Sequence, residues 1–189
     1  MFENKSHINS TDCLVTEVFP ATENFFLNDV FLVIINATKI PPHLALALNG
    51  KLFSLSVKGI SMDGEIGSFI KLIHQKRIET LFVKLTVPTL FTMEQLREEI
   101  KKCLLVHPKV DVENATCLTP IKDFCGSIYQ LETKKINFVF DLLPELEKQK
   151  KIQNTYHFNL EKHLVNNTFT LKKYTMHDIY ESIQSANFV

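Results

Sequence analysis

The sequence predicts an α+β fold built around a central antiparallel sheet. Short stretches alternate between apolar and polar residues and end at turn residues, while other stretches place apolar residues at helical spacing behind capping residues. These strands and helices follow one another without a strict β–α–β order. A length of 189 residues fits one domain. We expect a flexible N-terminus over 1–12 and a single domain over 13–189, with its core at 13–129 and a C-terminal extension at 130–189 whose role stays open.

Charge and composition exclude several classes of protein. The 21 basic and 21 acidic side chains cancel, so no excess positive charge is available to bind nucleic acid. The most apolar stretch, Val30 to Ile35, is too short to cross a bilayer, and the N-terminus lacks the pattern of a signal peptide. We therefore expect a cytoplasmic protein with no nucleic-acid or membrane partner. The spacing of histidines and cysteines matches no metal motif, and no phosphate-binding loop is present, so no cofactor or metal is predicted.

The first elements include the clearest one in the chain. Cys13 to Phe19 alternates as a strand, and Asn24 to Asn36 is apolar enough for either a buried helix or a strand. His43 to Val57 predicts a β-hairpin, because two alternating runs flank Asn49-Gly50, a dipeptide typical of two-residue hairpin turns.

The hairpin turn predicts which side chains share a face. Leu48 pairs with Lys51, and side chains alternate along each strand. One face then carries apolar side chains, which indicates a core face: Leu44, Leu46, Leu48, Phe53 and Leu55. The opposite face is small and polar, which would let a substrate or another backbone approach closely: His43, Ala45, Ala47, Ser54 and Ser56. On this face Ser56 is expected to lie opposite His43.

Two helices and a strand follow the hairpin. Asp63 is positioned to cap a helix whose apolar residues share one face: Ile66, Phe69, Ile70 and Ile73. Thr80 to Val87 reads as a strand, because it is rich in apolar and β-branched residues and ends before a proline. Thr92 and Gln95 form the pattern of a capping box, which predicts a helix running to about Leu104.

The next segment contains the candidate nucleophile. Residues 107–116 read as a loop, and either Cys117 or Thr119 opens a helix that runs through Tyr129. Pro120 in its first turn is typical of a helix start.

The last third of the chain predicts four further elements. Ile136 to Phe140 alternates as a strand, and 142–152 forms a charged helix. Phe169 to Tyr174 is a short strand. Thr175 with Asp178 then caps a final helix.

Cys117 is the cysteine with the strongest chemical context. At the start of a helix, the positive end of the backbone dipole lowers the pKa of a thiol and favours the thiolate. A neighbouring imidazole would complete an activated nucleophile. Cys103 and Cys125 lie among apolar residues and are expected in the core, and Cys13 lies in the first strand.

Two segments resemble circularly permuted papain-like cysteine hydrolases, which include permuted NlpC/P60 relatives and PPPDE-type deubiquitinating or desumoylating peptidases. The matching stretches are PPHLALALNGKLFSLSVKG around His43 and ATCLTPIKDFC around Cys117. The resemblance implies that Cys117 is the nucleophile, His43 the general base and acid, and Ser56 the residue that orients the imidazole. It also implies a protein or peptide substrate. Thr116 departs from the asparagine that usually precedes the PPPDE-type cysteine.

A second stretch, HPKVDVENATCL, is similar to the active-site region of ubiquitin-conjugating enzymes. The family has a cysteine followed by leucine ten positions after the histidine of a His-Pro pair, as His107 and Cys117 stand here. Lys109 replaces the family's asparagine, and the predicted helix from Thr92 stands where the family has a loop and a strand.

Three functions thus remain open, and two of them use Cys117. The first is a cysteine-dependent hydrolase of an amide, isopeptide or thioester bond that works through an acyl-enzyme. The second is a non-catalytic protein-interaction module on the same scaffold. The third is a thioester carrier like the ubiquitin-conjugating enzymes. The hydrolase requires that the fold bring His43 and Cys117 together.

Overall fold

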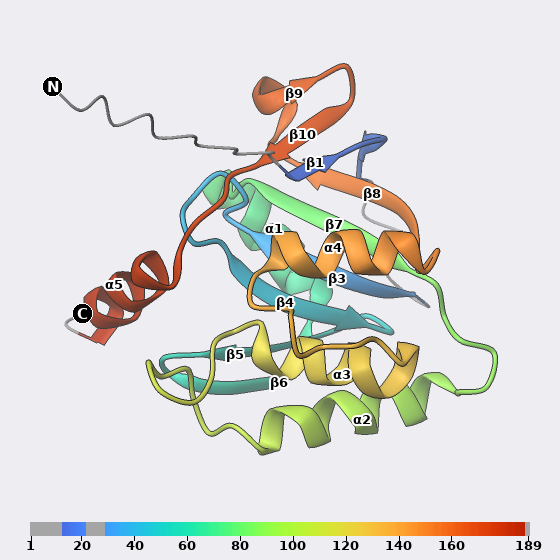
Figure 1. Cartoon of the computed structure of the whole chain (residues 1–189). Coiled ribbons are helices and arrows are strands. Elements are labelled where there is room, and N and C mark those ends of the chain that lie inside the picture. Colours follow the sequence, from blue (N-terminus) through green and yellow to red (C-terminus); the bar gives the residue numbers. More distant parts are fainter. Residues whose placement is uncertain (1–12, 22–28, 188–189) are drawn as a thin grey trace, which may run out of the picture.

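A seven-stranded sheet forms the middle layer of the molecule. The computed structural model describes residues 13–21 and 29–187. Three helices cover one face of the sheet and one helix covers the other (Figure 1). The predicted α+β class and its mostly antiparallel sheet are confirmed. The predicted flexible segment 1–12 lies outside the described residues.

The main sheet has the strand order β2-β8-β7-β3-β4-β5-β6. Every neighbouring pair in it is antiparallel except β2 and β8, which run parallel. Its strands, in chain order, are β2 (Val18–Pro20), β3 (Val30–Ile35), β4 (His43–Leu48), β5 (Lys51–Ser56), β6 (Gly59–Glu65), β7 (Thr80–Leu85) and β8 (Ile152–Phe158). A small second sheet consists of β1 (Cys13–Val15), β10 (Thr168–Leu171) and β9 (Leu164–Val165).

Five α-helices complete the described part of the chain. They are α1 (Ile66–Lys76), α2 (Met93–Leu105), α3 (Thr119–Tyr129), α4 (Val139–Lys148) and α5 (Met176–Asn187), and a short 3-10 turn, η2, spans Glu161–His163. None of the helices in these residues is long and apolar enough to cross a bilayer. Figure 1 shows α5 at the edge of the molecule, joined to β10 by an extended segment.

The two faces of the sheet have separate hydrophobic cores. Helices α2, α3 and α4 pack on the face that carries Leu46 and Phe53. Helix α1 packs on the opposite face, where Ile70 and Ile73 meet Ala45. Strand β3 lies in the middle of the sheet and is buried along its whole length, which explains why its sequence is continuously apolar.

The predicted hairpin is confirmed, and so is its register from Leu48 and Lys51 to Ala45 and Ser54, where the regular pairing ends. Leu48 pairs with Lys51 and Leu46 with Phe53, around a turn in which Asn49 and Gly50 both have positive φ. The expected core face is buried. The expectation of an open small-residue face is wrong for Ala45 and Ala47, which lie buried under α1. The sequence indicates an apolar face on α1 but not which side of the sheet that face covers.

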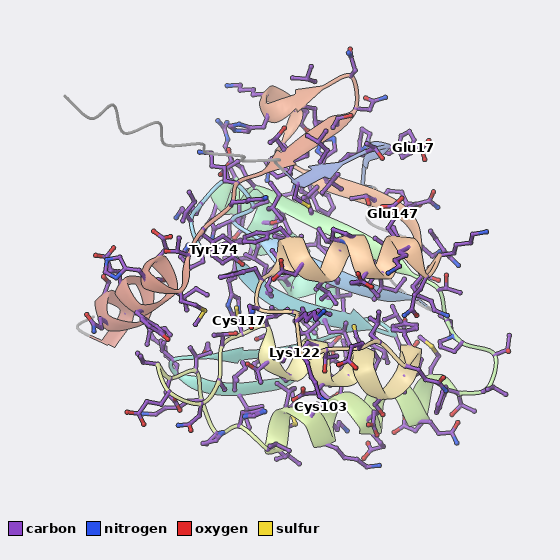
Figure 2. All side chains as sticks on the ribbon, in the orientation of Figure 1. Glu17, Cys103, Cys117, Lys122, Glu147 and Tyr174 are labelled. Atoms are coloured by element: carbon purple, nitrogen blue, oxygen red, sulfur yellow. The ribbon has the colours of Figure 1, made fainter. Side chains whose placement is uncertain are left out.

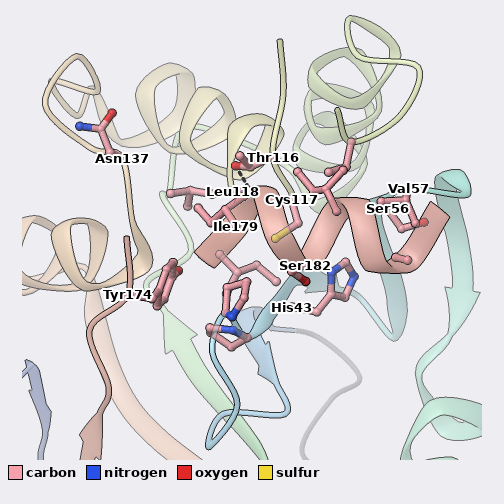
Figure 3. A pocket seen from close by; sticks show the side chains of 16 residues that line it. His43, Ser56, Val57, Thr116, Cys117, Leu118, Asn137, Tyr174, Ile179 and Ser182 are labelled. Carbon is pink, nitrogen blue, oxygen red and sulfur yellow. Dashed lines mark hydrogen bonds between the residues drawn. The ribbon is translucent and has the colours of Figure 1, made fainter. Parts of the chain in front are cut away.

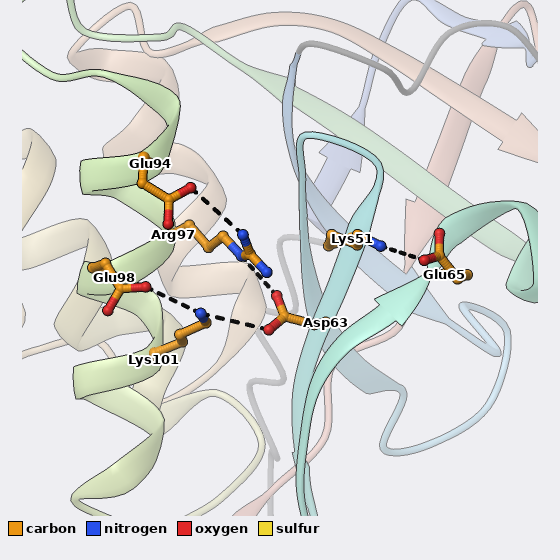
Figure 4. Close-up of polar contacts among 7 residues, drawn as sticks. All are labelled: Lys51, Asp63, Glu65, Glu94, Arg97, Glu98 and Lys101. Carbon is orange, nitrogen blue, oxygen red and sulfur yellow. Dashed lines mark hydrogen bonds and ion pairs between the residues drawn. The ribbon is translucent and has the colours of Figure 1, made fainter.

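The predicted cap at Asp63 is also wrong. Helix α1 begins after Glu65 without a side-chain cap, and Asp63 lies in strand β6 instead. Its carboxylate accepts a hydrogen bond from Arg97 on α2 at 2.8 Å and lies 3.5 Å from Lys101 (Figure 4). Partners more than thirty residues away in the sequence therefore replace the expected local contact.

Two of the predicted strands differ from the structure. The strand predicted over 136–140 is wrong, since Asp141 accepts hydrogen bonds from the N–H groups of Asn137 and Phe138 at 3.0 and 2.9 Å and so caps α4. The strand predicted from Cys13 is divided into β1 and β2, with positive φ at Glu17.

The ambiguous stretch Asn24 to Asn36 contains β3, while residues 22–28 lie outside the described part. The Thr92–Gln95 capping box is confirmed, and Thr175 and Asp178 cap α5 as predicted.

Candidate active site

Three segments that are far apart in the sequence meet at one pocket. Its lining includes His43 from the start of β4, Ser56 from the end of β5, and Cys117 from the loop before α3 (Figure 3). The pocket has a volume of about 190 Å³. Apolar side chains form most of its wall, among them Pro42, Leu44, Val57, Val110 and Leu118.

The pocket lies at the end of the hairpin where the regular pairing of its strands stops. The regular pairing of β4 with β5 extends from the turn to Ala45 and Ser54. Beyond that point the 107–118 loop approaches β5, and the Val110 N–H donates to the Ser56 carbonyl at 2.9 Å. The same loop brings Cys117 beside Leu44.

A tight turn positions Cys117 just before α3. The Thr116 N–H donates to the Thr119 hydroxyl at 2.9 Å, and the Thr119 N–H donates to the Thr116 carbonyl at 3.1 Å. The helix begins at Thr119, with Leu118 as its N-cap and Pro120 in the first turn. Of the two predicted helix starts, Thr119 is therefore confirmed and Cys117 is wrong, since Cys117 precedes the first helical residue by two positions.

The thiol of Cys117 is neutral at physiological pH in this arrangement. Burial raises the pKa of Cys117 to about 11, and this effect exceeds the opposing effect of backbone N–H groups at Leu44, Cys117 and Leu118. The predicted lowering of the pKa by the helix is therefore wrong for the structure as it stands. Removal from water disfavours the thiolate more than these backbone dipoles favour it.

His43 is neutral as well. Burial lowers the pKa of its imidazole, because the charged form loses hydration. No hydrogen bond involves its ring nitrogens within the residues that the structure describes. A ring nitrogen thus remains available to accept a proton, and Figure 3 shows the ring at the same pocket as the Cys117 sulfur.

Ser56 lines the pocket but uses its hydroxyl elsewhere. The hydroxyl donates to the Gly59 carbonyl at 3.1 Å and accepts from the Lys58 N–H at 3.2 Å. Both contacts belong to the turn between β5 and β6. The single proton of the hydroxyl is therefore not directed at the imidazole of His43.

Tyr174 belongs to the site although the sequence analysis does not single it out. Its ring packs against Phe138 and Phe140, with centroids 5.4 and 5.2 Å apart, and it lines the pocket with Cys117 (Figures 2 and 3). Burial, and to a lesser extent the nearby Cys117, keep the pKa of Tyr174 well above its usual value. The only local signal is an aromatic residue next to a predicted helix cap.

Helix α5 forms another unpredicted wall of the pocket. Ile179 and Ile183 are 8% and 6% exposed, and they line the pocket together with Ser182 and Ala186. Figure 3 shows the helix crossing the pocket close to His43 and Cys117. The spacing of the two isoleucines was a usable signal, because residues i and i+4 share one helix face.

The other candidate residues lie elsewhere. Cys103 and Cys125 are buried between α2 and α3, and burial raises their pKa values to about 11 and 12. His107 does not line the pocket, and its Nε2 lies 3.5 Å from the Asp123 carboxylate. Across residues 13–21 and 29–187, no three His, Cys, Asp or Glu side chains group as metal ligands.

Comparison of the chain with protein-family models, with curated proteins and with solved structures gives no match. Function is therefore inferred from the residues of this pocket.

Proposed function

We propose that the protein is a cysteine-dependent hydrolase of an amide, isopeptide or thioester bond. Cys117 is the nucleophile and His43 is the general base and acid. The observation that carries the proposal is the meeting of these two residues at one pocket, since 74 positions separate them in the sequence. The pocket is also where the resemblance to circularly permuted papain-like hydrolases would place an active site.

The reaction needs no group beyond those present. The Cys117 thiol gives its proton to a ring nitrogen of His43 while the sulfur forms a bond to the substrate carbonyl carbon. The imidazolium returns that proton to the leaving amine or thiolate, and the acyl-enzyme remains. Water then attacks the thioester and gives a proton to His43, which passes it to the departing Cys117 sulfur.

Backbone groups around Cys117 support this chemistry. The N–H groups of Leu44 and Leu118 lie close enough to the sulfur to favour its charged form. Donors in such positions also stabilise the oxyanion that develops when the sulfur attacks a carbonyl. Ser56 has no role in this scheme, because its hydroxyl is engaged within its own turn.

Acylation of the unmodified chain tests the proposal. The protein is mixed with small activated thioesters, and mass spectrometry locates and times any acyl group. We expect an acyl group that appears first on Cys117 and then disappears by hydrolysis. His43→Ala should slow both steps, while Cys125→Ala, which removes a buried thiol away from the pocket, should change neither. Slow and equal modification of all four cysteines would contradict the proposal.

A non-catalytic interaction module is the second candidate, and one observation favours it. The raised pKa of Cys117 leaves little thiolate at neutral pH, and no hydrogen bond between Cys117 and His43 is present in the described part of the chain. Such a module would show Cys117 no more reactive than Cys103, and His43→Ala would leave its reactivity unchanged.

A further inference from the structure

Helix α5 closes the pocket, and its attachment is limited. Among the residues that the structure describes, its polar contacts stay within the helix and its own cap: Thr175 with Asp178, His177 with Glu181 at 3.3 Å, and Ser185 with the Glu181 carbonyl at 2.8 Å. Ile179 and Ile183 are its most deeply buried side chains, and the residues between and beyond them are mostly exposed. Apolar contacts alone therefore hold this helix against the pocket.

The connection to α5 suits a hinge. Lys172, Lys173 and Thr175 are exposed, whereas Tyr174 between them is buried against Phe138 and Phe140. Movement about Thr175 would release the helix and leave Tyr174 in place. Such movement breaks no hydrogen bond between α5 and the sheet, because none is present among the described residues.

The pocket is too small for a protein substrate while α5 is in place. Its volume of about 190 Å³ is below the roughly 300–1,000 Å³ of pockets that hold ligands of moderate size. Ile179, Ser182 and Ile183 line this pocket together with Cys117 and His43, and Figure 3 shows α5 crossing it. Removing them would expose a groove walled by apolar side chains, including Pro42, Leu44, Val57 and Leu118.

We propose that α5 is a displaceable cover of the Cys117 pocket, and that an apolar segment of a protein substrate takes the place of Ile179 and Ile183. The substrate part rests on the hydrolase proposed above. The binding mode is that of an amphipathic helix in a groove, in which apolar residues at i and i+4 serve as anchors. The cover would keep the thiol out of water until a matching segment displaces it.

Alkylation of the full chain by iodoacetamide near neutral pH tests the cover. In the variant Ile179→Ser/Ile183→Ser, Cys117 should react at least about tenfold faster, because local opening becomes easier. Gln184→Ser, at an exposed position of the same helix, should leave the rate unchanged. Cys125 reports on global unfolding, since it is fully buried away from α5. An unchanged rate at Cys117 would overturn the cover.

Hydrogen exchange on the wild-type protein provides a second measurement if the double variant unfolds and Cys125 also reacts faster. Amides of α5 should exchange at least about tenfold faster than those of α3, through local opening. N-ethylmaleimide on Cys117 should accelerate exchange in α5 further, because the adduct occupies the pocket that α5 lines. Exchange of α5 at the rate of α3, before and after modification, would contradict a displaceable helix.

Adding His43→Ala to the double variant separates this proposal from the hydrolase. If both hold, the fast alkylation of Cys117 falls when His43 is removed. If only the cover holds, alkylation stays fast without His43. If only the hydrolase holds, the double variant reacts like the wild type, and small thioesters still acylate Cys117 in a manner that depends on His43.

Discussion

Both ends of the β4–β5 hairpin have the same alternation of side chains between the two faces of the sheet, but they differ in the segments that they contact. At the turn end, Leu46 and Phe53 face each other as a regular pair in the core. At the open end, the Val110 N–H of the 107–118 loop donates a hydrogen bond to the Ser56 carbonyl, and a pocket forms beside His43. The turn end is completed by pairing within the hairpin. At the open end, a ring nitrogen and a thiol face a cavity. The reactive groups thus lie only at the open end of this hairpin, whereas both ends carry buried apolar residues, Leu44 and Leu55 at one and Leu46 and Phe53 at the other.

The largest effect is expected at the turn end. Phe53→Ala removes a fully buried aromatic ring and should lower the free energy of unfolding by about 3–5 kcal/mol. Urea denaturation measures this loss, and Lys58→Ala, at an exposed position, is the control. A loss below about 1 kcal/mol would show that this end is less well packed than the structure indicates.

A substitution at the open end should change the rate of acylation and not the free energy of unfolding. His43→Ala should slow acylation of Cys117 by about 10²-fold or more, since the general base is lost, while the free energy of unfolding changes by less than about 1 kcal/mol. Stopped-flow acylation and urea denaturation of the same protein measure the two quantities. A large loss of stability with unchanged acylation would reverse the roles given to the two ends.

The turn itself provides a smaller effect. Gly50 has a φ of 73°, in the region that residues with a Cβ atom enter at a cost. Gly50→Ala should therefore destabilise the protein by about 1–2 kcal/mol without changing acylation. Thermal unfolding measures the loss. Ser54→Ala, within the same hairpin but away from the turn, is the control for a change to alanine that does not alter the turn. Equal stability of Gly50→Ala and wild type would argue against this turn geometry.

The smallest effect is a loss of stability at alkaline pH. Burial raises the pKa of Cys125 from 9.0 to about 12, so the folded state holds this proton more tightly than the unfolded state. The resulting stability is present below pH 9.0 and is lost as pH rises from there toward about 12. At pH 9.0, where the unfolded thiol is half ionised, the loss is about 0.4 kcal/mol.

Urea denaturation from neutral pH to pH 10 measures this slope. Cys125→Ala should make it shallower, and Cys117→Ala should do the same at the open end, because burial raises the pKa of that thiol to about 11. A slope that neither substitution changes would show that the two thiols titrate alike in the folded and unfolded states.

Short-range patterns were enough to predict several elements correctly. Asn49-Gly50 determined the hairpin register, because a two-residue turn leaves one pairing that buries the leucine face. The capping residues Thr92 and Thr175 located the starts of α2 and α5, because a cap bonds to N–H groups within three residues. The juxtaposition of His43 and Cys117 followed from a resemblance and not from any local pattern.

Long-range contacts decided what local patterns could not. Polar residues of β8 are uncharacteristic of a strand, yet the strand forms because β7 and β2 pair with it on both sides. Asp63 bonds to α2 instead of capping α1.

By itself, the sequence determined the α+β class, the hairpin, its register and the starts of α2 and α5, because each depends on neighbours a few positions away. Only the tertiary structure decided that α1 covers Ala45 and Ala47, that burial keeps the Cys117 thiol protonated, and that α5 lies over the pocket. These features depend on which surfaces exclude water from one another, and that is settled when distant segments pack together.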